Sequence, residues 1–446
     1  MSIVFQAIVL IIVITGLIYV VYKGFNQIIA CIIAAIIIAF AANLDVYSII
    51  TGDFMSSYSS LMSMMALKIL CSVTLGQIYI RGGGANAVSG LFEKMIIRDS
   101  KGIARKKITA YTYFGLCCLL CLGGFDAFAA IFTMLPIGLV FWEKADLPKY
   151  ILPGVMFAAV TLIGCVPATA QVNNLMAPTF FGSDQYGAAI PAIIGAAVML
   201  LLDLLMINSL INKAEKKGIG FERGKAQMAD FSDKKTPNGV LSLLPILLVF
   251  VMYTLMGIAQ EISMLCGIIL ALILFVPYMR DENGKISLTT IKQISEDSAS
   301  GAILGISMSG IQMGLAAVVS ATALFSKICE WFLMIPGSGY IGFAIAVTLL
   351  GFLAGSSTSG MMFGATVYGP VAESLGMTAN AMARIGVFGV AILDTIPICG
   401  PIIMSLNICG LTQKEGYGTI FKTTVLYVTI GIAVCTAICI LCPGLT

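Results

Sequence analysis

The sequence of 446 residues contains no histidine, and charged residues make up only 11% of it. A typical soluble domain is about 25% charged. Without histidine the chain cannot build a Ser/His/Asp catalytic set or a mixed Cys/His metal site, so any proton transfer has to use carboxylates or lysines. A Gly-rich phosphate loop ending in Lys-Ser or Lys-Thr is also missing. These absences argue against the common hydrolases, zinc enzymes and nucleotide-driven machines.

Apolar residues, by contrast, make up 59% of the chain. Because a run of roughly 17 to 25 apolar residues suffices to cross a bilayer, the sequence predicts an all-α polytopic membrane protein with ten spans. These lie at 3–22, 25–42, 58–80, 150–178, 188–212, 240–258, 262–280, 299–326, 380–407 and 417–442. The 13 cysteines lie mostly in apolar runs and are expected to act as small apolar side chains. We therefore expect no metal or other cofactor.

Two further apolar segments, 108–141 and 339–371, are too long for one span. As a single helix the first would be about 51 Å long, against a hydrocarbon core of about 30 Å. Small residues interrupt each segment near its middle, Gly123-Gly124 in the first and Gly355-Ser356 in the second. We predict that each folds as a re-entrant hairpin with two legs shorter than a span.

Basic residues cluster in two loops and fix the predicted topology. Seven of the 25 Lys and Arg residues lie in 81–107 and seven in 213–239. The positive-inside rule places both loops in the cytoplasm, and such a pattern is not a nucleic-acid footprint. The parity of spans then requires the first hairpin to enter from the cytoplasm and the second from outside. Both termini are predicted outside.

This tracing divides the chain into an inverted repeat. Residues 1–212 and 240–446 each have five spans and one hairpin, in the same order but in opposite orientation, and 213–239 forms a cytoplasmic linker with no other expected role. The span after each hairpin, 150–178 or 380–407, is predicted to be broken by proline.

Interrupted membrane helices survive only where they line a cavity enclosed by protein. Paired interruptions in two halves indicate the binding site of a secondary transporter, and helix N-termini there suit a carboxylate substrate. The predicted substrate-binding residues are the hydroxyl and amide residues at the breaks: Thr169, Gln171, Asn173, Asn174, Ser356, Ser357, Thr358, Ser359 and Thr395. Simple packing of small residues between helices is the alternative.

Ionisable residues inside a membrane are functional hypotheses by default. Asp126 and Asp394 lie at the breaks and are predicted to carry a coupled proton; capping of a broken helix is the alternative. Lys68 and Asp203 could form a buried pair or face a domain interface. Arg384 is expected to snorkel to the outer interface and not to contact substrate.

Several segments are similar to the gluconate permease family. These are Phe352 to Gly360, reading FLAGSSTSG, the run Gly410 to Glu415, and Gly124-Phe125-Asp126 with Leu135-Pro136. The resemblance implies a bacterial cytoplasmic-membrane symporter of the ion-transporter superfamily. It would take up a sugar acid, hydroxy acid or D-amino acid with protons by an elevator movement, as a homodimer. Sugar-acid members place a cluster with histidine after the second break, and 394–401 has none.

Three alternatives remain open. Ser, Thr, Asn and unwound carbonyl groups are also good ligands for a hard cation, so the coupling ion could be sodium. An intramembrane enzyme would need a base beside a nucleophile, and a passive anion channel would need no coupling at all. The expected partners are therefore a small organic anion, a proton or sodium ion, the lipid bilayer and a second copy of the chain.

Overall fold

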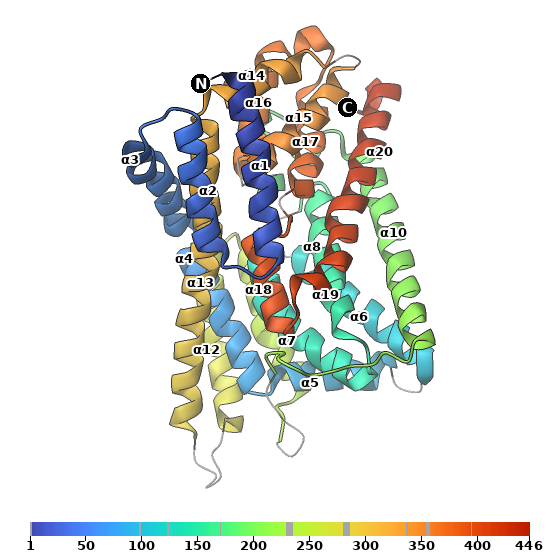
Figure 1. Ribbon diagram of the computed structural model, residues 1–446. Coiled ribbons are helices and arrows are strands. Elements are labelled where there is room, and N and C mark those ends of the chain that lie inside the picture. The colour runs from blue at the N-terminus through green and yellow to red at the C-terminus, as the bar shows by residue number, and fades with distance from the viewer. Residues whose placement is uncertain are drawn as a thin grey trace.

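The structure is a computed structural model, and all the regular elements it describes are helices (Figure 1). It describes residues 2–97, 100–122, 125, 127–169, 171–228, 235–279, 286–335, 338–353, 357–393 and 395–446. Within these ranges, seven helical segments are long and apolar enough to cross a membrane. The prediction of an all-α polytopic membrane protein is confirmed.

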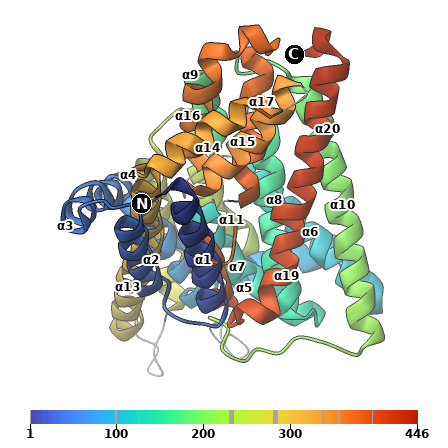
Figure 2. The same cartoon turned by 45° about the horizontal axis from the view of Figure 1, so that its top comes forward.

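Long helices form two edges of the molecule. Along one edge α2 (Gln27–Ala41) and α4 (Met55–Arg81) pack against the 33-residue α13 (Leu288–Ser320), and along the other α10 (Ala189–Lys216) packs against α20 (Tyr427–Leu441) (Figures 1 and 2). The remaining elements around these edges are α1 (Ile3–Tyr22), α3 (Val46–Ile49), α5 (Gly84–Phe92), α11 (Gly239–Phe250), α12 (Gln260–Phe275), α14 (Ala323–Leu333) and α19 (Gln413–Phe421).

The first of the two long apolar segments, predicted as a hairpin at 108–141, forms an antiparallel pair of helices, α6 (Gly102–Leu122) and α7 (Ala127–Ala145). The Tyr113 hydroxyl of α6 donates a hydrogen bond to the Met134 carbonyl of α7 at 3.1 Å, and its ring packs edge-on against Trp142, with centroids 5.1 Å apart. With 21 and 19 residues, both helices are longer than expected, and α7 is long enough to cross a membrane. Their re-entrant position therefore stays a prediction.

The second pair, α15 (Gly339–Leu353) and α16 (Ser357–Tyr368), is also antiparallel. The Phe343 and Tyr368 rings meet edge-on with centroids 5.3 Å apart. Nearer the turn, Gly351 and Gly360 bring the two backbones into direct contact, because a Cβ atom added to Gly360 would lie only 2.4 Å from the Gly351 Cα. Glycine is thus required at position 360 by the close approach of its neighbour.

Two broken helices follow these pairs. The first consists of α8 (Leu152–Cys165) and α9 (Val172–Phe181), and the second of α17 (Ala379–Leu393) and α18 (Gly400–Cys409). Val166 leaves the helical conformation at φ −75° and ψ 129° because proline follows it, and Ala168 takes a left-handed φ of 60°. The packed centre of the molecule lies here, since most of α7 and α8 is buried.

One predicted boundary is wrong. The expected span 299–326 is replaced by α13, which begins at Leu288 and ends at Ser320. The Thr322 side chain accepts a hydrogen bond from the backbone N–H of Phe325 and starts a new helix, α14, in a different direction (Figure 2). The apolar run continues across this cap, so hydropathy alone does not reveal it.

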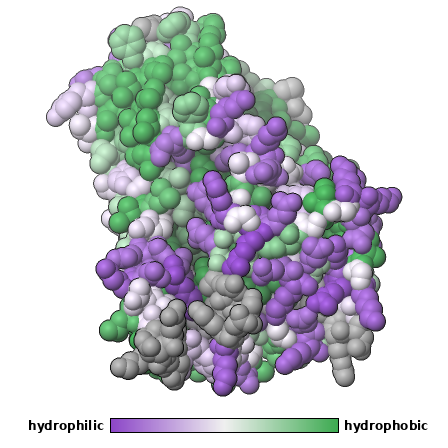
Figure 3. All heavy atoms as spheres, turned by 60° about the horizontal axis from the view of Figure 1, so that its bottom comes forward, coloured by the Kyte–Doolittle hydropathy of each residue, from purple (hydrophilic) through white to green (hydrophobic). Residues whose placement is uncertain are grey.

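The two ends of the molecule differ in polarity. Both termini lie at one end, whereas α5 and the chain that follows α10 lie at the other (Figure 1). Hydrophilic side chains gather on that second end (Figure 3). The described part of the linker is bonded to the helices there: the Gln227 N–H donates to the Ile408 carbonyl at 2.8 Å, and Lys149 donates to the Arg223 carbonyl at 2.9 Å.

Candidate functional site

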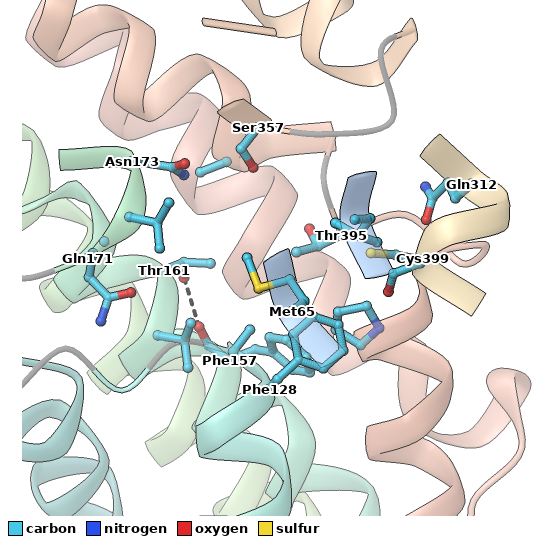
Figure 4. Close-up of a pocket in the computed structure, with 18 of the residues that line it drawn as sticks. Met65, Phe128, Phe157, Thr161, Gln171, Asn173, Gln312, Ser357, Thr395 and Cys399 are labelled. Carbon is cyan, nitrogen blue, oxygen red and sulfur yellow. Dashed lines mark hydrogen bonds between the residues drawn. The ribbon is translucent and has the colours of Figure 1, made fainter. Parts of the chain in front are cut away.

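A cavity of about 240 Å³ lies where the helix pairs and the broken helices meet (Figure 4). Its walls come from α4, α7, α8, α9, α13, α16 and the break between α17 and α18. Four sequence-predicted residues line it, namely Gln171, Asn173, Ser357 and Thr395. The structure therefore brings the breaks of both halves to one cavity.

Four helices begin at this cavity. The lining includes Phe128 in the first turn of α7, Asn173 in that of α9 and Ser357 at the start of α16, with Cys399 and Pro401 at the start of α18. The first turn of a helix leaves N–H groups without partners inside the helix, and its end carries about half a positive charge. The converging helix starts therefore supply N–H donors to the cavity, and the last turns of α8 and α17 also line it, at Gly164 and Ala391.

The lining residues that the structure describes are all uncharged. Besides apolar groups, the cavity is lined by three amides and four hydroxyls: Gln171, Asn173, Gln312, Thr161, Ser309, Ser357 and Thr395. Some of these already bond to protein groups: Thr161 Oγ1 donates to the Phe157 carbonyl at 2.8 Å, and Thr395 Oγ1 lies 2.7 Å from the Thr424 hydroxyl. An anion here would be held by partial charges and hydrogen bonds.

Gln171 connects the broken helix to the first helix pair. Its Nε2 donates to the carbonyl oxygens of Cys121, at 2.7 Å, and Phe125, at 2.9 Å. Carbonyl groups at the end of a helix lack partners within it, so this amide satisfies two groups that would be costly to bury alone. Gln171 thus both lines the cavity and connects α9 to Phe125 and the C-terminal end of α6.

Thr169 and Asn174 lie behind the cavity wall. Asn174 is fully buried, and its Nδ2 donates to the carbonyl oxygens of Gly164, at 2.8 Å, and Val166, at 3.0 Å. The Thr169 hydroxyl is 3.1 Å from the Ile163 carbonyl and accepts from Asn174 Nδ2 at 2.9 Å. In this structure both side chains satisfy backbone groups freed by the break and do not line the cavity.

Five predicted site residues cannot be placed fully. Asp126, Asp394 and Ser356 lie outside the described residues, and the side chains of Thr358 and Ser359 do so as well. The assignment of the coupled proton to Asp126 or Asp394 stays a prediction.

Arg384 does not snorkel, which corrects the expectation from its position near a span end. Its side chain is 1% exposed and lies between α17 and α9. The guanidinium donates to Asn174 Oδ1 at 2.8 Å and to the carbonyl oxygens of Gln185 and Gly187 at 2.7 and 3.1 Å. These acceptors, about 200 positions earlier in the chain, carry no sequence signal that pairs them with an arginine.

Lys68 and Asp203 do not form the buried pair considered above. Lys68 lies 3.6 Å from Glu261 of α12, and both side chains are about one-quarter exposed. Asp203 is fully buried in α10, and neither of its carboxyl oxygens has a hydrogen-bond partner among the described residues.

Sequence reasoning missed the wall that α4 and α13 contribute, including Met65, Ser309 and Gln312. Gln312 is buried and lines the cavity. The available signal was a lone amide in an apolar helix, which is costly unless it faces a cavity.

Comparison with known proteins gives one distant relationship. No protein-family model matches the chain. The chain is similar to the uncharacterized transporter YxjC of Bacillus subtilis (strain 168), with 22% identity over 460 residues. The similarity covers 92% of this chain and 94% of the relative, so it extends over both halves.

Proposed function

We propose that this protein is a secondary transporter of a small organic anion and that the central cavity binds the anion. The observation that carries the proposal is the convergence of four helix N-termini on one cavity, whose described lining residues are uncharged and come from breaks far apart in the sequence. Broken helices with their positive ends directed at a substrate are the hallmark of secondary-transporter sites. The name of the Bacillus subtilis relative supports transport.

The proposed mechanism is alternating access within an inverted repeat. The order of elements supports it: a long helix, a short helix, an antiparallel pair, a broken helix and a final long segment occur from α4 to α10 and again from α13 to α20. We infer that the pairs and broken helices form a mobile transport unit, whereas α4 and α13 belong to a scaffold. The cavity then lies between the two, as an elevator movement requires.

Uptake is proposed to be coupled to protons, in a dimer in the bacterial cytoplasmic membrane with both termini outside. Asp126 and Asp394 are the proposed proton carriers, because a protonated carboxyl group removes the repulsion of an anionic substrate. Sodium coupling remains the second candidate, favoured by the hydroxyl and amide lining.

Uptake by purified protein in liposomes tests the proposal. A labelled organic acid should accumulate under an imposed pH gradient, and Asn173→Ala and Ser357→Ala should each raise the KM about tenfold, the equivalent of about 1.4 kcal/mol. Asn208→Ala and Ser209→Ala, on α10 away from the cavity, are matched controls that should leave uptake unchanged.

The outcomes separate the alternatives. Accumulation that follows a sodium gradient at fixed pH selects sodium as the coupling ion. Equilibration without accumulation under any gradient would identify a channel, and conversion of the acid to a product would identify an enzyme. Equal KM values for the cavity and control variants would overturn the site.

A further inference from the structure

One side of the cavity is apolar. Met65 of α4, Phe128 of α7 and Phe157 of α8 lie together there (Figure 4). Leu61, Val160 and Met313 also line the cavity and extend its apolar surface. Asn173 and Ser357, at the starts of α9 and α16, lie apart from the two phenylalanine rings in the same view (Figure 4). The cavity therefore has a part lined by helix starts with polar side chains and a part that is apolar.

Three of the seven polar side chains that line the cavity are already engaged by protein groups, whereas the Ser309 hydroxyl of α13 has no partner among the described residues. Thr161 already donates to a backbone carbonyl, Gln171 uses its Nε2 on two carbonyl groups, and Thr395 is paired with Thr424. The hydroxyl groups of a sugar acid placed against Phe128 and Phe157 would lose their hydrogen bonds to water without replacement. A second carboxylate in that place would be still less favourable.

The cavity volume of about 240 Å³ is below the roughly 300–1,000 Å³ typical of sites for drug-sized ligands, which suits a small organic acid.

Resting on the transport function proposed above, we propose that the substrate is a short-chain monocarboxylate with an apolar chain. Its carboxylate lies at the converging helix starts beside Asn173, and its chain packs against Met65, Phe128 and Phe157. This specificity differs from the sugar acids that the resemblance to gluconate permeases implies.

Affinities of the purified wild-type protein for a homologous series test the proposal directly. The series is acetate, propionate, butyrate and valerate, with gluconate and succinate at matched concentration and pH, and binding is read from ligand-induced thermal stabilisation. Affinity should rise roughly fourfold with each added methylene. Burial of one CH₂ group lowers the free energy of binding by the amount to which this factor corresponds. Butyrate should bind at least tenfold more tightly than gluconate or succinate.

A pair of methionine variants locates the apolar part. Met65→Ala removes three heavy atoms from the cavity wall, so hexanoate should gain at least fourfold in affinity relative to butyrate. Met64→Ala, the adjacent residue on α4, which is 55% exposed and outside the cavity, should leave that ratio unchanged. If Met65→Ala does not fold, the affinities of the wild-type protein for the acid series decide whether the proposal holds.

The apolar-chain proposal would be overturned if affinity did not change with chain length, or if gluconate or succinate bound as tightly as butyrate. If affinity did not change with chain length but gluconate accumulated in liposomes, the proposed transport function would still hold. If no organic acid is bound or accumulated, the transport function itself fails.

Discussion

Replacement of Gly360 by alanine tests whether the packing of the second helix pair positions the substrate site. A Cβ atom at this position would lie 2.4 Å from the Cα and 2.7 Å from the N of Gly351. Non-bonded carbons pack at about 3.5–4.0 Å, so α15 and α16 must separate by about 1 Å. Ser357, three residues before Gly360 on α16, would move with its helix.

The expected free-energy change follows from two opposing effects. Overpacking of this kind costs about 1–3 kcal/mol, whereas alanine gains about 0.5–1 kcal/mol over glycine within a helix. We expect a net loss of about 1–2 kcal/mol, seen as a Tm about 1–4 °C lower. Loss of one hydrogen bond to a charged ligand group, about 1.5 kcal/mol, would weaken substrate binding roughly tenfold.

A thiol-reactive dye can follow the unfolding, because most of the 13 cysteines are buried and become reactive only when the chain opens. Gly115→Ala in α6 is the matched control, since no atom lies within 4 Å of its added Cβ. It should be neutral or slightly stabilising. Equal Tm values and equal substrate affinities for the two variants would refute the close contact and its link to the site.

Substitutions at four further positions test the contacts of buried polar and charged side chains. Arg384→Met should lower the free energy of unfolding by about 2–4 kcal/mol, with Arg384→Lys intermediate, because buried Asn174 Oδ1 loses its donor; equal Tm values for both variants and wild type would contradict this. Gln171→Leu frees two carbonyl groups and should cost about 2–3 kcal/mol and reduce uptake, and unchanged uptake would exclude it from the site. Asp203→Asn should change the unfolding free energy by less than about 1 kcal/mol and leave pH-driven uptake intact, since a buried carboxyl group without a partner among the described residues is expected to be neutral. Loss of proton coupling in this variant would instead identify Asp203 as the proton carrier. Lys68→Met should cost at most about 1 kcal/mol, as for an ordinary surface ion pair, and a larger loss would show a stronger role.

Sequence patterns located the helices and breaks where local chemistry decides them. The span 3–22 coincides with α1 because its apolar run ends at Lys23, and the helix break near Pro167 follows from the restricted backbone before proline. The clustering of Gln171 and Asn173 with Ser357 was predictable because unpaired backbone and amide groups in a membrane must gather around a cavity.

Long-range partners were not predictable. A single sequence gives no sign that Arg384 meets carbonyl groups of residues 185 and 187, or that Asn174 supports the break from behind while Asn173 faces the cavity. Two adjacent amides look alike in sequence, and the direction of the helix after the break decides which one points inward. The contribution of α4 and α13 was missed for the same reason, because their cavity-lining residues belong to no motif.

A cavity without lysine or arginine among its described lining residues suits a transporter better than a site built on such a cation. A unit charge 4 Å from a carboxylate is worth about 4 kcal/mol at an effective dielectric constant of 20, concentrated in one contact. A helix terminus contributes typically about 0.3–1 kcal/mol, so the converging starts of α7, α9, α16 and α18 give a moderate attraction shared among several elements. Small displacements of these helices, which belong to two helix pairs and two broken helices, would weaken that attraction gradually. Arg384 has its guanidinium directed at Asn174 and loop carbonyl groups, so it holds α9 in place and is not directed at the cavity. The arrangement proposed to attract an anion would thus also allow its release.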